Sequence, residues 1–276
     1  MNKVMFFVYL LTCSIGNAVF AVDEPAATPA TVPLPATKIN SKDGAEMIFI
    51  PAGEFLMGST DTDKKAKDNE KPQRKVNLNS YYIYKTEVTV AQYRKFCVAT
   101  GRKMPDAPDW GWQDNHPIVN VSWNDAKAYA DWAGVVLPTE AQWEKAARGT
   151  DGRVYPWGNE WDKTKCANWS NSCDGDTLTG THQVGSFPKG ASPFGVIDMS
   201  GNAYEWCADW YGDNYYKTAP AKNPTGPVTG DKRVLRGGSW GDYYDYYWCR
   251  VACRGYTNPD YYGYGVIGFR CASPCQ

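Results

Sequence analysis

Tyrosine and carboxylate side chains crowd together near the C-terminus of this chain, at a spacing that no helix or strand period explains. The stretch GGSWGDYYDYYWCR runs from Gly237 to Arg250, and eight of the 19 tyrosines lie between Tyr243 and Tyr264. If this segment were core, each of many buried hydroxyl groups would need a hydrogen-bond partner. Tyrosine mixed with Asp, Asn and Gly is instead the composition of antibody recognition loops, in which stiff, amphipathic rings contact a ligand.

These side chains are suited to the recognition of a binding partner. Exposed tyrosines at this density mark a surface that a partner covers, so we predict a ligand-binding face. The alternative is an aromatic lining packed against the rest of the domain, which explains some of the rings but not the Tyr-Tyr-Asp-Tyr-Tyr run. The predicted ligand-binding residues are Asp242, Tyr243, Tyr244, Asp245, Tyr246, Tyr247, Tyr256, Asn258, Asp260, Tyr261, Tyr262 and Tyr264.

Several other kinds of chemistry have little material in this chain. His116 and His182 are its two histidines, too few for a His-rich metal site or for a histidine-dependent triad. No Gly-rich phosphate loop is present in the sequence. The formal net charge of −1 argues against nucleic acid or anionic membrane as a partner, because both require a basic excess. The charge run KKAKDNEKP, from Lys64 to Pro72, is interpreted as a solvated loop.

Short elements and many turns must position the tyrosines. Helices are predicted over 88–101 and 122–134, and a third in PTEAQWEKAARG, where Thr139 and Gln142 have the spacing of a capping box. The run MIFIPAGEFLMGS, which starts at Met47, predicts a hairpin around its Pro-Ala-Gly turn. After residue 150 no long helical period follows. With 26 Gly and 18 Pro, the chain is predicted to form a loop-rich α+β domain.

The N-terminus has the features of an export signal. Residues 1–21 combine a charged start, a short apolar core and small residues for cleavage, and the apolar run is shorter than the ~20 residues of a membrane-spanning helix. Residues 22–39 are rich in Pro, Ala and Thr and are interpreted as a linker, followed by one domain over 40–276. We therefore expect an exported protein without a transmembrane helix, in the periplasm, at the cell surface or secreted. A lipoprotein modified at Cys13 is the alternative.

The cysteine count agrees with export. There are nine cysteines, and removal of Cys13 with the signal leaves an even number, which suits disulfides in an oxidising compartment. Cys166 and Cys173 flank the short loop CANWSNSC and can close it, but the connectivity of the set remains open. Four further cysteines cluster at the C-terminus: Cys249, Cys253, Cys271 and Cys275.

Eight phrases, in order along the chain, resemble those of the formylglycine-generating enzyme (sulfatase-modifying factor) family. The resemblance runs from Met47 to Ala272, nearly the whole predicted domain. It implies a C-type-lectin-like fold with little regular secondary structure, in agreement with the loop-rich prediction. The phrases are IPAGEFLMGS, KTEVTVAQYRKF, VSWNDAKAYADW, LPTEAQWEKAARG, YPWGN, GVIDMSGNAYEWCADWY, RVLRGGSW and GFRCA.

The family resemblance also implies two structural calcium sites. Calcium prefers several hard oxygen ligands and accepts irregular loops, so carboxylates and main-chain carbonyls at these positions suit it. The alternative is that the carboxylates only cap turns. The first implied site comprises Asn168, Trp169, Asp176 and Leu178, and the second comprises Asp198, Gly201, Ala203 and Glu205.

At the active site the chain departs from the family pattern. The family's oxidases carry two redox cysteines after the Gly-Gly-Ser-aromatic turn, and these hold copper. Counted from Ser239, the corresponding positions are Asp242 and Tyr247, and neither can supply a thiolate. Cys249 and Cys253 are interpreted as structural cysteines rather than as a substitute redox pair. We therefore expect no copper site and no formylglycine formation by the usual chemistry.

The contents of the tyrosine segment also resemble the variable proteins of diversity-generating retroelements. Those proteins often use the C-type-lectin-like fold and end with a mutated segment before a GFR-like terminus. The leading hypothesis is thus an exported, monomeric, calcium-supported display protein that binds an unknown protein or surface ligand through a hypervariable face. One alternative is a divergent formylglycine-generating oxidase or related enzyme that modifies a cell-envelope protein. The other is a structural envelope protein.

Overall fold

The computed structural model describes residues 37–171, 173–174, 177–178, 180–243 and 245–275. The predicted signal peptide, Cys13 and all of the predicted linker except its last three residues lie outside these ranges. Those last three residues, Thr37–Ile39, form strand β1 and pair with the next strand, so the folded domain begins slightly earlier than predicted. Within the described residues, no helix has the length and apolar character needed to span a membrane.

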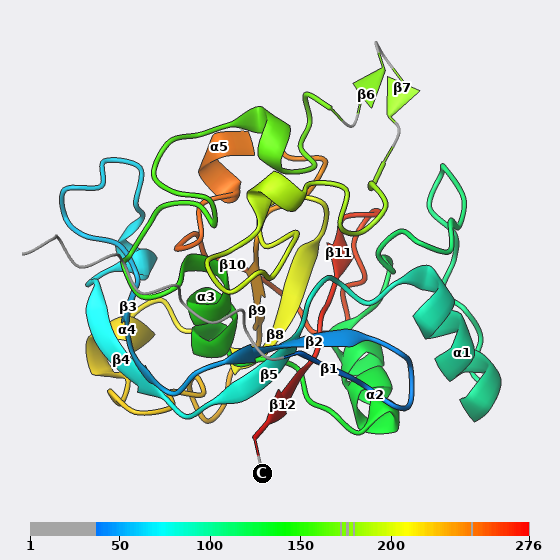
Figure 1. Cartoon of the computed structure of the whole chain (residues 1–276), viewed down its shortest axis with the longest axis horizontal. Coiled ribbons are helices and arrows are strands. Elements are labelled where there is room, and N and C mark those ends of the chain that lie inside the picture. The colour runs from blue at the N-terminus through cyan, green and yellow to red at the C-terminus, as the bar shows by residue number, and fades with distance from the viewer. Residues whose placement is uncertain (1–36, 172, 175–176, 179, 244, 276) are drawn as a thin grey trace, which may run out of the picture. The chain divides into compact units, whose positions relative to one another are not determined.

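Two small sheets organise the domain (Figure 1). In the first, all neighbouring strands are antiparallel. Its order is β1, β2 (Glu46–Ile50), β5 (Tyr81–Tyr84) and β12 (Ala272–Pro274), which joins the two ends of the described chain. The second has the order β10 (Gly255–Thr257), β9 (Arg233–Arg236), β8 (Tyr204–Trp210) and β11 (Ile267–Gly268), of which β11 is parallel to β8.

The predicted hairpin around Pro51 does not form. Strand β2 pairs with β1 and β5, whereas β3 (Gly53–Met57) pairs with β4 (Arg74–Leu78) in a separate two-stranded sheet. The turn was recognised, but the chain uses it to pass from one sheet to another. A further short pair consists of β6 (Cys173–Asp174) and β7 (Thr177–Leu178).

The three predicted helices are present, each with a capping box at its start. These are α1 (Val90–Thr100), α2 (Trp123–Ala133) and α3 (Glu140–Arg148). At α3 the Thr139 side chain accepts from the Gln142 backbone amide, and Gln142 Oε1 accepts from the Thr139 backbone amide, as the sequence predicted. Single-turn elements complete the fold: α4 (Tyr215–Thr218), α5 (Asp245–Trp248), η1 (Asp68–Glu70), η2 (Lys163–Lys165) and η3 (Pro188–Gly190).

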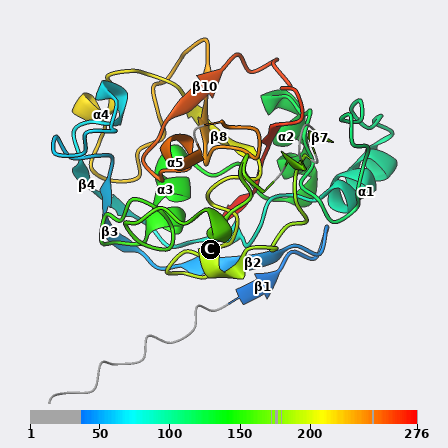
Figure 2. The same cartoon turned by 90° about the horizontal axis from the view of Figure 1, so that it is seen from above.

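Helix α3 lies near the middle of the domain, with α1 and α2 on one side and the β3–β4 hairpin on the other (Figures 1 and 2). It carries buried charge as well as an apolar stripe. Trp143, Ala146 and Ala147 pack into the core, while Glu140 and Glu144 are equally buried. Both carboxylates are paired with arginines from the C-terminal half, so ion pairs fix the second half of the chain to this helix.

Candidate functional site

A cleft of about 500 Å³ lies beside the tyrosine segment. Its floor includes residues from three neighbouring strands: Tyr204 on β8, Leu235 on β9 and Gly255 on β10. Loops and short elements that are distant in sequence form its walls, so the second sheet is the platform that positions the site. The remaining lining residues are Lys67, Asn69, Tyr211, Asp213, Trp248, Arg254 and Tyr256.

Most of the predicted tyrosines are exposed. The exposed fraction is 69% for Tyr243, 61% for Tyr262 and 86% for Tyr264. Tyr246, Tyr256 and Tyr261 are each at least 40% exposed. Buried tyrosines elsewhere, such as Tyr129 in the core, are fully covered, so exposure is a property of this segment rather than of tyrosine in general. Tyr244 and the side chain of Asp245 lie outside what the structure describes.

These tyrosines fall into separate groups rather than one continuous layer. Tyr256 lines the cleft and packs on Tyr211 with ring centroids 4.0 Å apart. Tyr243 meets Trp169 instead, at 5.7 Å. In a third group, the ring of Tyr261 lies near those of Tyr262 and Tyr264, with centroids 6.5 and 6.3 Å apart. The sequence therefore located the exposed residues but not their grouping.

The polar members of the predicted face have structural partners. Asp242 accepts a 2.7 Å hydrogen bond from the Ser239 amide and a 3.1 Å bond from the Tyr204 hydroxyl. Asp260 accepts a bond from the side chain of Asn124, and Asn258 accepts one from the Asp260 amide. Burial and the charge of Asp242 raise the pKa of Tyr204 well above its usual value. The carboxylate at the first redox position therefore stabilises the turn and orients a tyrosine of the cleft.

The interpretation of residues 64–72 as a simple solvated loop was incomplete. Glu70, within the charge run, is fully buried and accepts from both terminal nitrogens of Arg250, at 2.9 and 2.6 Å. Arg250 also binds Asp63 at 3.0 Å and the Lys65 carbonyl at 3.1 Å. The loop is thereby fixed against the end of the tyrosine segment, and Lys67 becomes a wall of the cleft.

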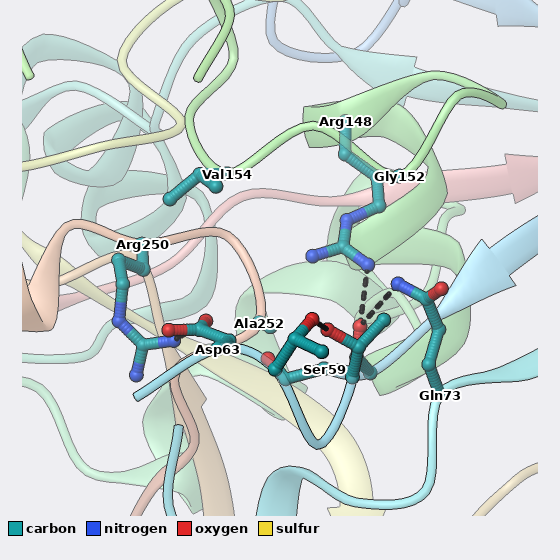
Figure 3. A pocket seen from close by; sticks show the side chains of 11 residues that line it. Ser59, Asp63, Gln73, Arg148, Gly152, Val154, Arg250 and Ala252 are labelled. Atoms are coloured by element: carbon teal, nitrogen blue, oxygen red, sulfur yellow. Dashed lines mark hydrogen bonds and ion pairs between the residues drawn. The ribbon is translucent and has the colours of Figure 1, made fainter. Parts of the chain in front are cut away.

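Figure 3 shows the other side of this anchor, where Arg250 and Asp63 face a second cavity of about 270 Å³. Across that cavity, Arg148 donates to the Gly58 carbonyl at 2.8 Å, and Gln73 donates to the same oxygen at 3.2 Å. The Arg148 bond holds Gly58, which follows β3, to α3, and Arg250 holds the loop further along the chain. Both arginines are buried.

The described cysteines give no support to a substitute redox pair. Burial raises the pKa of the Cys253 thiol to about 12, so it remains protonated at neutral pH. Cys249 packs with Cys166 and Tyr155 in a small buried cluster. Cys271 and Cys275 are thiols in this structure, so disulfides among the C-terminal cysteines are not shown. The pairing of Cys166 with Cys173 stays a prediction, because the side chain of Cys173 is not described.

Buried carboxylates gather at the second implied calcium site. Glu205 accepts two bonds from Arg270, at 2.6 and 2.7 Å, and one from Trp143. Asp198 accepts from the Gly185 amide at 2.6 Å, and burial raises its pKa to about 6. Gly201 and Ala203, the implied carbonyl ligands, lie between these two acids in sequence, and Ala203 is fully buried. Calcium here stays a prediction.

Sequence reasoning missed one buried acid near this site. Glu87 is buried beside Asp198, and burial, with the charge of Asp198, raises its pKa well above the usual value. Among the described residues, its Oε2 atom has no hydrogen-bond partner. Three buried carboxylates thus face one guanidinium, that of Arg270. The excess negative charge fits a bound cation or a retained proton. In the sequence, Glu87 lies within the phrase KTEVTV and was not singled out there.

The first implied calcium site is described only in part. Asn168 is buried, and its Oδ1 atom accepts a 3.0 Å bond from the Ser170 amide. Asp176 lies outside the described residues, and Leu178 is present in strand β7 without a described side chain. The main chain nevertheless connects the two sites: the Asn202 amide donates to the Ala167 carbonyl at 3.0 Å. In the described part of the chain, no three acidic, His or Cys side chains surround one point as metal ligands, at this site or at the second.

Calcium is expected to raise the melting temperature, because an ion bound only by the native state adds stability, about 2.7 kcal/mol at a hundredfold excess over Kd. The Asp198→Asn variant should lose most of this response, since it keeps the acceptor for Gly185 and removes the charge. Glu205 is a poorer choice for the test, because it also pairs with Arg270. Thermal melts with calcium and with excess chelator measure the effect. Identical melting of the wild type in both would contradict the assignment.

A loop-rich α+β domain with the GGS-aromatic turn beside a cleft defines the class of protein. The family described as "Sulfatase-modifying factor enzyme 1-like domain" matches residues 33–274, so the chain belongs to this family. It is 37% identical to the formylglycine-generating enzyme of Streptomyces coelicolor, over 92% of this chain and 96% of that relative. The predicted family is confirmed.

Solved structures confirm the predicted fold class. The structure of PvdO from Pseudomonas aeruginosa has a TM-score of 0.76 and 29% identity, and the match covers 89% of this chain and 100% of PvdO. Treponema denticola variable protein 1 has a TM-score of 0.69 and 24% identity, over 88% of this chain and 100% of that one. This second likeness shows that the fold is shared.

Proposed function

We propose that this protein binds a ligand through the tyrosine-rich surface around the cleft and does not form formylglycine. The observation that carries the proposal is the pair of residues at the family's redox positions, Asp242 and Tyr247. Asp242 is engaged by Ser239 and Tyr204, and Tyr247 is part of the short helix α5. Neither offers a thiol to a metal or to a substrate cysteine.

The contrast between the buried Gly-Gly-Ser-Trp turn and the exposed tyrosines after it supports a role in ligand recognition. Ser239 and Trp240 of the turn are buried, whereas Tyr243, a few residues later, is largely exposed. Large aromatic side chains that remain exposed next to a cleft supply contact area at a small loss of conformational entropy on binding. We further propose that the protein is exported and monomeric, and that this face varies between related copies. Its partner would be a protein or a surface ligand.

An enzymatic function is the second candidate, and one observation favours it. Tyr204, which lines the cleft, donates a hydrogen bond to Asp242, the residue at the first redox position. An enzyme using these groups would act by acid–base chemistry or binding rather than by cysteine redox chemistry. In this hypothesis the substrate is a protein of the cell envelope.

The first test is direct assay for formylglycine. After copper loading, the purified protein should leave the cysteine of a sulfatase-type peptide unchanged, because no described thiol lies at either redox position. Mass spectrometry of the peptide detects the loss of sulfur. Turnover that disappears in a Cys249→Ser variant would overturn the proposal and favour the enzyme.

Binding itself is tested with a displayed peptide library. Selection on the wild type should enrich sequences that a variant with serine at Tyr243, Tyr246 and Tyr256 no longer retains. The matched control places serine at Val98 and Val228, which are 81% and 95% exposed and lie outside the tyrosine segment. Equal retention by wild type and serine variant, with both folded, would remove the binding face from consideration.

A further inference from the structure

Three exposed lysines lie over aromatic rings of the tyrosine-rich C-terminal region, and of these groups Lys67, Trp248 and Tyr256 line the cleft. The Lys65 ammonium is 4.5 Å from the ring centre of Tyr246, and Lys67 is 4.4 Å from that of Trp248. Lys232 is 4.5 Å from the ring centre of Tyr256. Two of the three come from the loop that the sequence presented as merely solvated, and the third precedes β9.

These ammonium groups have no ion-pair partner in the part of the chain that the structure describes. Of the acids nearby, Asp63 and Glu70 pair with Arg250, and Asp213 accepts from the Tyr211 hydroxyl. A cation held over a ring keeps its N–H groups available, because the ring attracts the charge without accepting all of its hydrogen bonds. The lysines are therefore positioned but not neutralised.

Arg254, the other cation lining the cleft, differs from the lysines. Its guanidinium bonds to both oxygens of Glu140, at 2.7 and 2.9 Å, and to the carbonyls of Asn69 and Gly212. It is buried, and each of its three guanidinium nitrogens donates to at least one of these partners. Arg254 fixes the wall of the cleft, whereas Lys65, Lys67 and Lys232 are the cations that a ligand can reach.

The placement of the lysines favours a protein ligand over a sugar. A sugar ring binds an aromatic side chain by lying on its face, and lysines occupy one face of Tyr246, Trp248 and Tyr256. A carboxylate instead reaches the ammonium directly. In addition, β10 is an outer strand of its sheet, so its free edge can accept an extended peptide.

We propose that the cleft binds an acidic, extended protein segment, whose carboxylates pair with Lys65, Lys67 and Lys232 while its backbone follows β10. The inference rests on the proposed binding function and names the class of its ligand. It assigns a role to Lys65 and Lys67 of the loop over residues 64–72, which the proposed binding function alone leaves unexplained. The tyrosines supply contact area, and the lysines select for acidic sequence.

Poly-L-glutamate is the probe for the test, and the fluorescence of the tryptophans reports its binding. The affinity should fall as sodium chloride rises from about 50 mM to about 300 mM, because exposed charges are screened. Replacement of Lys65, Lys67 and Lys232 by glutamine should weaken binding by about tenfold or more. The control removes the same charge from the exposed lysines Lys95, Lys103 and Lys189 and should leave the affinity unchanged.

Other outcomes would overturn the inference in distinguishable ways. Stronger binding of polygalacturonate than of poly-L-glutamate would identify an anionic polysaccharide as the ligand. Unchanged binding in the serine variant at Tyr243, Tyr246 and Tyr256 would show non-specific attraction to lysine. If neutral library peptides bind independently of salt and of the lysines, the acidic ligand is wrong while the binding function stands. If no library peptide and no probe binds, the binding function fails with it.

Discussion

Replacing Glu140 with glutamine is expected to lower the free energy of unfolding by about 3–5 kcal/mol, the range for breaking a buried ion pair. Glu140 accepts from Arg254 at 2.7 and 2.9 Å and from Arg236 at 3.2 Å. All three side chains are nearly or fully buried. Glutamine keeps the shape and part of the hydrogen bonding, but it leaves two buried guanidinium groups with less compensating charge.

The effect should depend on pH in a defined direction. Burial alone would raise the pKa of Glu140, but Arg254 and Arg236 outweigh it and hold the pKa below the ordinary value of 4.5. A carboxyl group with a depressed pKa stabilises the fold above its ordinary pKa and loses that contribution as the pH falls through the folded value. The difference between wild type and variant should therefore be full at neutral pH and shrink in acid.

Urea unfolding at several pH values measures the difference. Glu54→Gln is the matched control, because Glu54 pairs with Lys75 at 2.9 Å on the surface, where both side chains are at least half exposed. Such a pair contributes about 0–1 kcal/mol. Similar losses in the two variants would show that the buried network has no special role in holding the C-terminal half to α3.

Local signals were sufficient to predict the helices and the class of the fold. The pairing of Thr139 with Gln142 depends on residues three positions apart, so the sequence displays it directly. The hairpin at Pro51 failed because a turn does not specify which strands pair. Strand β2 finds its partner in β5, across the whole of the β3–β4 hairpin. Pairing at that range depends on tertiary packing, which alternation of residue types does not encode.

The sequence predicted the exposed tyrosines of the site but not the partners of its charged residues. Tyrosine composition indicated the exposed rings, but the burial of Glu70 depends on Arg250, 180 residues away. Read alone, KKAKDNEKP has the composition of a loop in water. Asp242 is likewise separated by 38 residues from its partner Tyr204, which lies on β8. Long-range polar pairs of this kind leave no periodic signal.

Replacing Trp240 with alanine should cost about 3–5 kcal/mol of stability, as truncation of buried aromatics does. Only 4% of Trp240 is exposed. Its indole N–H donates to the Gly265 carbonyl at 2.8 Å, and its ring meets Trp110 edge-on at 5.1 Å. The alanine variant would lose the ring contacts and leave the Gly265 carbonyl without this donor. Urea or thermal unfolding of the purified variant measures the loss.

The control is the set of neighbouring tyrosines, and it decides what the segment is for. Single serine substitutions at Tyr243, Tyr262 and Tyr264 should each change stability by no more than about 0.5 kcal/mol, since these rings are mostly exposed. Binding should change in the opposite sense, with large losses concentrated in a few rings. A recognition surface requires this combination: a buried turn that folding needs unchanged, and exposed side chains beside it that folding does not need. If the serine variants lose several kcal/mol each, the tyrosines belong to the core and the binding face is wrong.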